Sequence, residues 1–188
     1  MSVQRPGTGA LPGPRQSFGP YRVCLVCLGN ICRSPMAEVV LREELARAGL
    51  AGAVAVESAG TGDWHVGERI YGPAGVELAR HGYDGSAHRA RQIEASWLGR
   101  YDLLLAMDKG NLADLLRMAR GSDAAGRIRL LRSFDSGLAD DDPFDGEVPD
   151  PYGGQPGEYA RAFGLIHAAA KGLAGQLAEF LGAQPAGR

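Results

Sequence analysis

Cysteine is scarce in this sequence, and none lies beyond residue 32. The chain has three cysteines among 188 residues, and all of them fall within Cys24–Cys32. A small secreted domain held by disulfides spreads its cysteines along the chain, so this distribution argues against such a framework and favours a reducing, cytoplasmic compartment. No second Cys or His pair has the spacing of a zinc finger, which disfavours a metal site.

A strong excess of charge and a long apolar run are also missing. The formal net charge is −2 at pH 7, which provides no broad basic surface, so we expect no nucleic-acid partner. No apolar run is long enough to span a membrane, and residues 1–20 lack the apolar stretch of a signal peptide. We therefore expect no membrane partner, and export by a route without a signal peptide stays open.

Length and composition are those of one globular domain. A chain of 188 residues, 45% of them hydrophobic, fits the usual size and core of a single domain. Residues 1–20 have proline and glycine at many positions, and we predict a disordered N-terminal extension there. We expect a single folded domain over 21–182 and a loose tail over 183–188.

Strand-like and helix-like patterns alternate along this domain. The predicted strands cover 21–27, 53–58, 101–107 and 128–131. The predicted helices cover 36–48, 74–80, 111–120 and 158–181, the last with candidate interruptions at Gly164, Gly172 and Gly175. This order predicts an α/β three-layer sandwich, with a central four-stranded parallel sheet and helices on both faces. Ligands of such sheets bind beyond the carboxyl ends of the strands.

The most informative stretch follows the first predicted strand. It begins at Cys27 and reads Cys-Leu-Gly-Asn-Ile-Cys-Arg-Ser-Pro. Gly29 and Asn30 tolerate the positive φ of a tight loop, and Ser-Pro suits a helix start. Backbone N–H groups and the positive end of the helix dipole would converge on one point, an arrangement that binds phosphate and favours the thiolate form of cysteine. The predicted phosphate-binding loop consists of Leu28, Gly29, Asn30, Ile31, Cys32, Arg33 and Ser34.

The residues in this loop favour phosphate chemistry. A thiolate on Cys27 beneath a bound phosphoryl group can attack phosphorus, and Arg33 can hold two of the phosphoryl oxygens. The residues alone therefore predict a cysteine-dependent phosphatase. The plainer alternative is a buried cysteine at a strand end with a surface arginine, since this spacing also arises by chance.

Two other motifs with similar residues fit less well. A Walker phosphate loop is excluded because no Gly-Lys-Ser/Thr follows the loop. Cys24 and Cys27 have the spacing of a thioredoxin-like pair, but residues three apart on a strand point to opposite faces. We expect Cys24 to be a core residue.

A phosphatase also benefits from a proton donor for the leaving oxygen. The segment 137–157 is acidic and rich in proline and glycine, and long loops of this kind are often functional. Taken singly, each carboxylate there is more often a solvated loop group than a catalyst, and spacing does not choose among them. The candidates are Asp140, Asp141, Asp142, Asp145, Glu147 and Asp150.

The loop sequence together with Asp-Pro-Tyr-Gly at residues 150–153 resembles the low-molecular-weight protein tyrosine phosphatases, over roughly residues 21–180. Segments 61–67 and 131–135 are most similar to actinobacterial members. The resemblance implies that Cys27 is the nucleophile, that Arg33 binds the phosphoryl group and that Asp150 is the general acid. It implies no cofactor and no metal.

The same resemblance implies residues that support the loop. A hydrogen-bond network that includes a strained Asn30 would hold the loop and tune the thiolate. Its members would be Asn30, Ser34, Ser58 and His88. Asp108 matches a further position of the family near the site.

A phosphotyrosine phosphatase needs a deep crevice with aromatic or apolar walls, and its candidates are Leu28, Ile31, Trp64 and Tyr152. Trp64 could instead be a partly exposed core residue, and Tyr152 a loop-packing residue. Family members often have two tyrosines after Asp-Pro, whereas Gly153 takes the second position here, so we expect one wall to be thinner. Cys32 is either inert packing or a redox partner that forms a reversible disulfide with Cys27 under peroxide.

Three rival functions fit parts of this pattern. Arsenate reductases of this fold need further cysteines, which the chain lacks after Cys32. Protein arginine phosphatases usually carry threonine where Ile31 lies, so phosphotyrosine is favoured and phosphoarginine is the alternative. A silent phosphate-dependent binding module is disfavoured by the intact set of Cys27, Arg33 and Asp150. The expected partners are phosphotyrosine proteins of bacterial signalling, a tyrosine kinase being one candidate, and inorganic phosphate or another oxyanion in the site.

Overall fold

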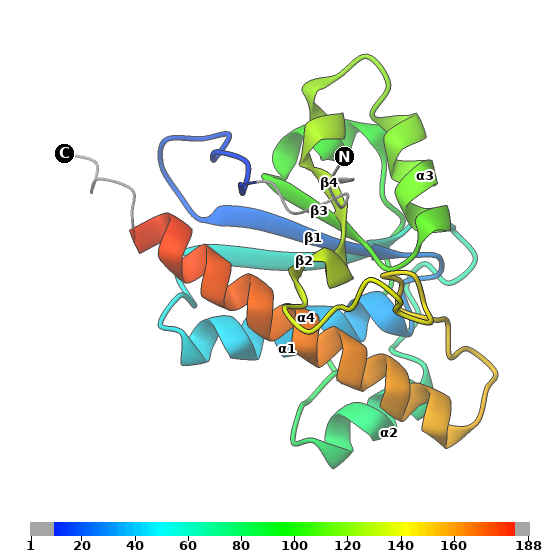
Figure 1. Ribbon diagram of the computed structural model, residues 1–188. Helices are drawn as coiled ribbons and strands as arrows, with labels where there is room; N and C mark the ends of the chain where they lie inside the picture. The colour runs from blue at the N-terminus through cyan, green and yellow to red at the C-terminus, as the bar shows by residue number, and fades with distance from the viewer. Residues whose placement is uncertain (1–9, 183–188) are drawn as a thin grey trace.

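A parallel sheet of four strands forms the centre of the computed structural model, which describes residues 10–182 (Figure 1). The strands lie in the order β2-β1-β3-β4. They are β1 (Tyr21–Cys27), β2 (Val54–Gly60), β3 (Leu103–Ala106) and β4 (Ile128–Leu130). Strands β1 and β3 are apolar runs buried on both faces, as expected for the middle of a parallel sheet.

Helices cover both faces of this sheet. Figure 1 shows α1 (Arg33–Arg47), α2 (Gly72–Arg80) and α4 (Pro156–Gly182) on one side, and α3 (Lys109–Met118) on the other. The short 3₁₀ helices are η1 (Ala95–Arg100), η2 (Asp123–Arg127) and η3 (Leu131–Phe134). One core lies between the sheet and α1 and α4, and a second between the sheet, η1 and α3. The predicted three-layer α/β sandwich is confirmed.

Side chains of β1 alternate between these two cores. Val23 and Leu25 belong to the core under α1, whereas Cys24 and Val26 belong to the core under α3. Cys27 lies in the first core, so the two cysteines of the Cys-x-x-Cys spacing are on opposite faces of the sheet. The prediction that Cys24 is a core residue is confirmed, and burial raises the pKa of its thiol to about 12.

Each α-helix begins two or three residues before its predicted start, and α4 differs also in its continuity. Helix α1 begins at Arg33 instead of residue 36, because the loop after β1 leads directly into its first turn. Helix α4 is continuous, so the candidate interruptions at Gly164, Gly172 and Gly175 are wrong. An interior glycine costs a helix only about 1 kcal/mol, and the buried apolar face of α4 outweighs that cost. At Gly172 the missing side chain also lets the backbone of Phe134 approach the helix.

Residues 10–20 contact the domain, although they fall within the predicted disordered extension. Leu11 is buried, and the hydroxyl of Tyr21 donates to the carbonyl of Pro12 at 3.0 Å. Arg15 donates to the carbonyl of Tyr101 at 2.8 Å and to the carboxylate of Asp123 at 2.8 Å. The prediction of disorder therefore does not hold for this part. Residues 1–9 and the predicted tail at 183–188 lie outside the described residues.

Candidate active site

The carboxyl ends of β1 and β2 meet at the loop that joins β1 to α1. The register pairs Cys27 with Gly60, so β2 ends level with the cysteine. The loop backbone turns over the thiol, and the N–H of Asn30 points at Sγ of Cys27 from 3.2 Å. The hydroxyl of Ser34, in the first turn of α1, lies 2.9 Å from the same sulfur. The strand, the loop and the helix N-terminus therefore converge on Cys27, which is 3% exposed.

The guanidinium of Arg33 is buried and held from three sides. Its Nη1 donates to Oδ2 of Asp108 at 2.6 Å and to the carbonyl of Val148 at 3.1 Å, and its Nη2 donates to Oδ2 of Asp150 at 2.8 Å. Burial alone would lower the pKa of Arg33, but the Cys27 and Asp150 charges and the hydrogen bond to Asp108 raise it above its ordinary value. The side chain thus remains a fixed cation beside the thiol.

The two carboxylates beside Arg33 come from different elements. Asp108 caps α3, accepting the N–H of Asn111 at 2.7 Å, so its position follows from the helix start. Asp150 lies in the loop before α4, and its side chain is 42% exposed. Among the acidic loop residues proposed as candidates, Asp150 lines the cavity at Cys27. Asp142 instead pairs with Arg132, and Asp145 pairs with Lys109.

Asn30 connects the loop to the end of β2. Its φ of 55° lies in the left-handed region, which matches the strain expected there. Its Nδ2 donates to Oγ of Ser34 and to Oγ of Ser58, both at 2.9 Å. Its Oδ1 accepts the backbone N–H of Arg91 at 2.8 Å, and its backbone carbonyl bonds Nε2 of His88 at 2.6 Å. The structure therefore brings the four predicted network residues together.

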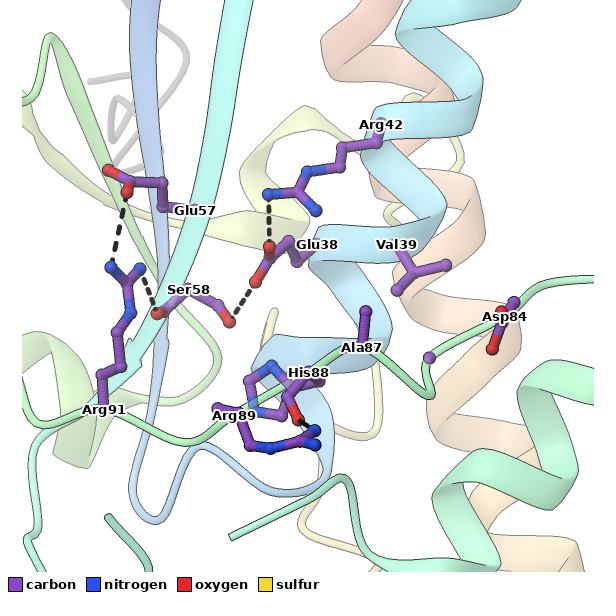
Figure 2. A pocket seen from close by; sticks show the side chains of 11 residues that line it. Glu38, Val39, Arg42, Glu57, Ser58, Asp84, Ala87, His88, Arg89 and Arg91 are labelled. Atoms are coloured by element: carbon purple, nitrogen blue, oxygen red, sulfur yellow. Dashed lines mark hydrogen bonds and ion pairs between the residues drawn. The ribbon is translucent and has the colours of Figure 1, made fainter. Parts of the chain in front are cut away.

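A second cavity, of about 280 Å³, lies behind this network (Figure 2). Figure 2 shows the side chain of Ser58 directed at Glu38. The Ser58 hydroxyl donates to the Glu38 carboxylate, which is also paired with Arg42. Burial lowers the pKa of His88 below its ordinary value, although the hydrogen bond to Asn30 and the charge of Glu38 act in the opposite direction. His88 is therefore a neutral imidazole whose Nε2–H donates to the loop carbonyl.

The cavity that opens at Cys27 has a volume of about 140 Å³. Each predicted crevice residue lines it, together with Gly29, Cys32, Arg33 and a histidine that sequence reasoning did not select. The wall residues are Leu28, Ile31, Trp64, His65 and Tyr152. Trp64 is 68% exposed and Tyr152 is 56% exposed, which suits residues at the mouth of a crevice and not core packing.

Tyr71 contacts the wall formed by Tyr152. The ring centroids of Tyr71 and Tyr152 are 4.9 Å apart, and the N–H of Tyr71 donates to the carbonyl of Ile31 at 2.8 Å. Gly153 has a φ of 74°, a backbone conformation that a tyrosine would rarely adopt. Tyr71, from a distant part of the chain, therefore supplies the second aromatic ring on this side of the crevice.

Sequence reasoning missed Glu38, His65, Tyr71 and the main-chain role of Arg91. His65 and Tyr71 lie near the segment at 61–67 that carries the resemblance, but nothing in their spacing indicates that they face the loop. Glu38 falls one turn after the loop on α1, which was the available signal.

Cys32 is buried, and burial is the largest cause that raises the pKa of its thiol to about 12.

Solved structures with this fold include a protein tyrosine phosphatase. An Entamoeba histolytica protein tyrosine phosphatase aligns with a TM-score of 0.79 and 28% identity, covering 86% of this chain and 99% of that one. Bacillus subtilis YfkJ aligns with a TM-score of 0.77 and 32% identity, covering 90% and 100%. The fold and the position of the loop thus define the class.

Sequence comparison defines the family. Residues 22–182 match the profile of the low molecular weight phosphotyrosine protein phosphatases. The low molecular weight protein-tyrosine-phosphatase of Streptomyces coelicolor is 47% identical over 153 residues, which are 81% of this chain and 91% of that protein. Phosphatase A of Mycobacterium tuberculosis is 45% identical over 158 residues, 82% and 90% of the two chains. The chain belongs to the low-molecular-weight protein tyrosine phosphatase family, a family of hydrolases.

Two predictions concern metals and membranes. Within residues 10–182, no group of three or more His, Cys, Asp or Glu side chains is arranged to hold a metal ion. In the same range, no helix combines the length and apolar character needed to cross a membrane.

Proposed function

We propose that this chain hydrolyses phosphotyrosine in proteins through a phosphocysteine formed on Cys27. The observation that carries the proposal is the convergence of the thiol, the N–H of Asn30, the Arg33 guanidinium and the Asp150 carboxyl on one cavity. An N–H donor and a fixed cation beside a nucleophile are the groups that stabilise a phosphoryl group during transfer.

In the first step the Cys27 thiolate attacks phosphorus, and the P–O bond to the tyrosyl oxygen breaks. Arg33 and the loop N–H groups bind the equatorial oxygens, in competition with the bond between Nη2 and Asp150. A phosphoryl oxygen that takes up Nη2 releases Asp150 from Arg33. Asp150 in its protonated form, with the proton taken from water in the preceding cycle, then gives that proton to the departing phenolate. Asp108 keeps the guanidinium in place through Nη1 during this exchange.

In the second step water attacks the phosphocysteine, and Asp150 accepts a proton from that water. The P–S bond breaks, which releases inorganic phosphate and regenerates the thiolate. Arg33 and the loop N–H groups supply the positive charge that faces the phosphoryl oxygens, so we expect the reaction to need no metal. The Ser34 hydroxyl, 2.9 Å from the sulfur, is placed to donate to the thiolate when it leaves.

The crevice walls support phosphotyrosine as the substrate. Trp64 and Tyr152 present aromatic surface at the mouth, and Ile31 at the loop offers no hydroxyl to a phosphoarginine guanidinium. The names of the relatives, which are protein tyrosine phosphatases, also support phosphotyrosine as the substrate. Phosphotyrosine proteins of bacterial signalling in the cytoplasm, including a tyrosine kinase, follow as the partners to test.

The experiment compares turnover of matched phosphotyrosine and phosphoarginine peptides by the purified protein, with Cys27→Ser as the blank. We expect phosphotyrosine to be preferred, turnover to survive EDTA, and Cys27→Ser to be inactive but folded. Asp150→Ala should slow poor phenol leaving groups more than good ones. Turnover by Cys27→Ser would contradict the nucleophile, equal losses across the leaving groups would contradict the acid, and preference for phosphoarginine would contradict the substrate.

A further inference from the structure

Gly62 is fixed to the loop that carries the thiol. Its N–H donates to the carbonyl of Leu28 at 2.8 Å, and the N–H of the preceding Thr61 donates to the carbonyl of Cys27 at 2.9 Å. These are backbone bonds in a segment that directly follows β2. The position of Gly62 relative to Cys27 is therefore set by two short contacts.

The indole of Trp64 lies directly over Gly62. A Cβ on Gly62 would overlap Cζ3 and Cε3 of the indole and would lie 2.7 Å from Cη2. Gly62 is not among the glycines with positive φ, so its backbone conformation is open to any residue. The three atoms nearest to such a Cβ all belong to the indole, so the steric requirement for glycine at this position comes from Trp64.

This contact differs from those of the neighbouring glycine. A Cβ on Gly60 would meet the carbonyl oxygen of Leu28 at 2.6 Å, which is backbone of the loop itself. At Gly62 the obstructing group is a side chain that is 68% exposed and has room to move outward. An alanine at Gly62 would therefore displace the aromatic wall and leave the phosphate-binding loop in place.

We propose that Gly62 is a positioning residue that determines specificity for aryl phosphates by seating Trp64 against the loop. The proposal rests on the proposed function, since Trp64 is the wall that would contact the phenyl ring of phosphotyrosine. Gly62 does not touch the substrate. It sets the distance between the phosphate cradle and the aromatic wall, so that the ring of a substrate meets the indole when its phosphoryl group reaches Cys27.

Two ligands distinguish an effect on the aromatic wall from an effect on the phosphate-binding loop. Phenylphosphonate carries a ring and a non-hydrolysable phosphoryl group, whereas inorganic phosphate carries no ring and contacts only the loop. We expect Gly62→Ala to raise the Kd of phenylphosphonate about tenfold, the scale of one aromatic contact, and to change the Kd of phosphate by less than about twofold. Gly52→Ala is the matched control, because a Cβ there meets nothing within 4 Å.

A double-mutant cycle tests whether the effect passes through the indole. Trp64→Ala should weaken phenylphosphonate binding by a similar factor, and adding Gly62→Ala to it should have no further effect, because the obstructing ring is gone. An additive loss would overturn the proposal. Equal losses for phosphate and phenylphosphonate in Gly62→Ala would also overturn it, since they would place the damage in the loop.

Fluorescence gives a readout that does not depend on binding or turnover. The chain has two tryptophans, so in a Trp97→Phe background Trp64 is the only one. Its anisotropy decay should gain a fast nanosecond component in Gly62→Ala and not in Gly52→Ala. An unchanged decay would refute the seating of the indole. If the parent protein fails to hydrolyse phosphotyrosine, the proposed function falls, while the anisotropy result still decides the role of Gly62.

Discussion

Asn30 holds the phosphate-binding loop with both its backbone and its side chain. Its N–H faces the Cys27 sulfur, and its amide group makes three further hydrogen bonds to Ser34, Ser58 and Arg91. Asparagine suits this position, where φ is 55°, because it tolerates the left-handed region and its side chain carries both a donor and an acceptor. The geometry of the site thus depends strongly on one residue whose side chain takes no part in the reaction.

We expect Asn30→Ala to lower kcat at least tenfold and to reduce the free energy of unfolding by about 2 kcal/mol, from lost buried hydrogen bonds and unrelieved strain. Asn30→Gly separates the two causes. Glycine accepts the positive φ, so it should recover part of the stability but little of the activity. Urea denaturation and steady-state kinetics on the same preparations give both values. Full activity in Asn30→Gly would show that the backbone conformation suffices without the amide.

The neutral His88 makes stability depend on pH. Burial lowers its pKa in the folded chain, whereas the unfolded chain retains a pKa of about 6.5. Below about pH 6.5 the unfolded state binds a proton at His88 that the folded state does not bind. The contribution of His88 to the free energy of unfolding is therefore fully present above about pH 6.5 and is lost as the pH falls from there towards the pKa of the folded state. Stability falls towards acid pH because the pKa of His88 is lower in the folded chain than in the unfolded chain.

We therefore expect His88→Gln, measured by urea denaturation between pH 7.5 and about 5, to flatten part of this fall. His167→Gln is the control, since His167 is a half-buried histidine of α4 that pairs with Glu44, outside the loop network. A stability profile in His88→Gln that runs parallel to the parent profile would contradict the assignment.

At the scale of elements, α4 contains three glycines with different surroundings. A Cβ on Gly164 or on Gly175 meets nothing within 4 Å, and both positions are exposed. A Cβ on Gly172 would collide with the backbone carbonyl of Phe134 in η3. Two of these glycines are thus tolerated by the helix, and the third is required by a neighbouring element.

We expect Gly164→Ala to raise the free energy of unfolding by about 0.5–1 kcal/mol, because alanine is the better helix former. Gly172→Ala should lower it by at least about 1 kcal/mol, the usual cost of forced overpacking. The two variants are each other's control, since they make the same substitution in the same helix. Denaturant unfolding of both decides the matter, and stabilisation by Gly172→Ala would mean that η3 gives way easily.

The elements were easier to predict from sequence than the contacts between them. Apolar runs and helix periodicity located each strand and each α-helix, since those patterns follow from local burial. The continuity of α4 was missed, because the apolar face that outweighs the cost of its glycines is defined only by packing on α1 and η3. Likewise Tyr71 and His65 reach the crevice through loop conformation, which leaves no periodic trace. Cys27, Arg33 and Asp150, which the structure brings to one cavity, could be proposed from sequence because their motifs lie on short stretches of chain, although the choice of Asp150 needed the family resemblance.

At the scale of the whole molecule, the segment before β1 and the candidate site lie at opposite ends of the sheet. Arg15 bonds groups around the start of β3, including the carboxylate of Asp102 and the carbonyl of Tyr101. The phosphate-binding loop follows the carboxyl end of β1. Stability contributed by this segment is therefore separate from the chemistry.

We expect Arg15→Ala to reduce the free energy of unfolding by about 1–3 kcal/mol, because the carbonyl of the buried Tyr101 loses its side-chain donor, while kcat and KM at a temperature well below the transition stay unchanged. Thermal unfolding and kinetics on phosphotyrosine peptide test this pair of outcomes. Arg117→Ala, which removes an exposed arginine of α3, is the control for lost charge. A change of kcat in Arg15→Ala would connect the two ends of the sheet.

Both aromatic walls of the crevice are attached to carbonyls of the same loop. Gly62 bonds Leu28 below Trp64, and Tyr71 bonds Ile31 beside Tyr152. Both attachments are main-chain bonds, so they do not depend on which side chains the segment 61–71 carries. An engineer could treat that segment as a replaceable cassette, exchanging it between relatives or randomising its side chains to produce phosphatases with altered substrate preference. The proposed catalytic residues Cys27, Arg33 and Asp150 lie outside the segment and would be the same in every member of such a library.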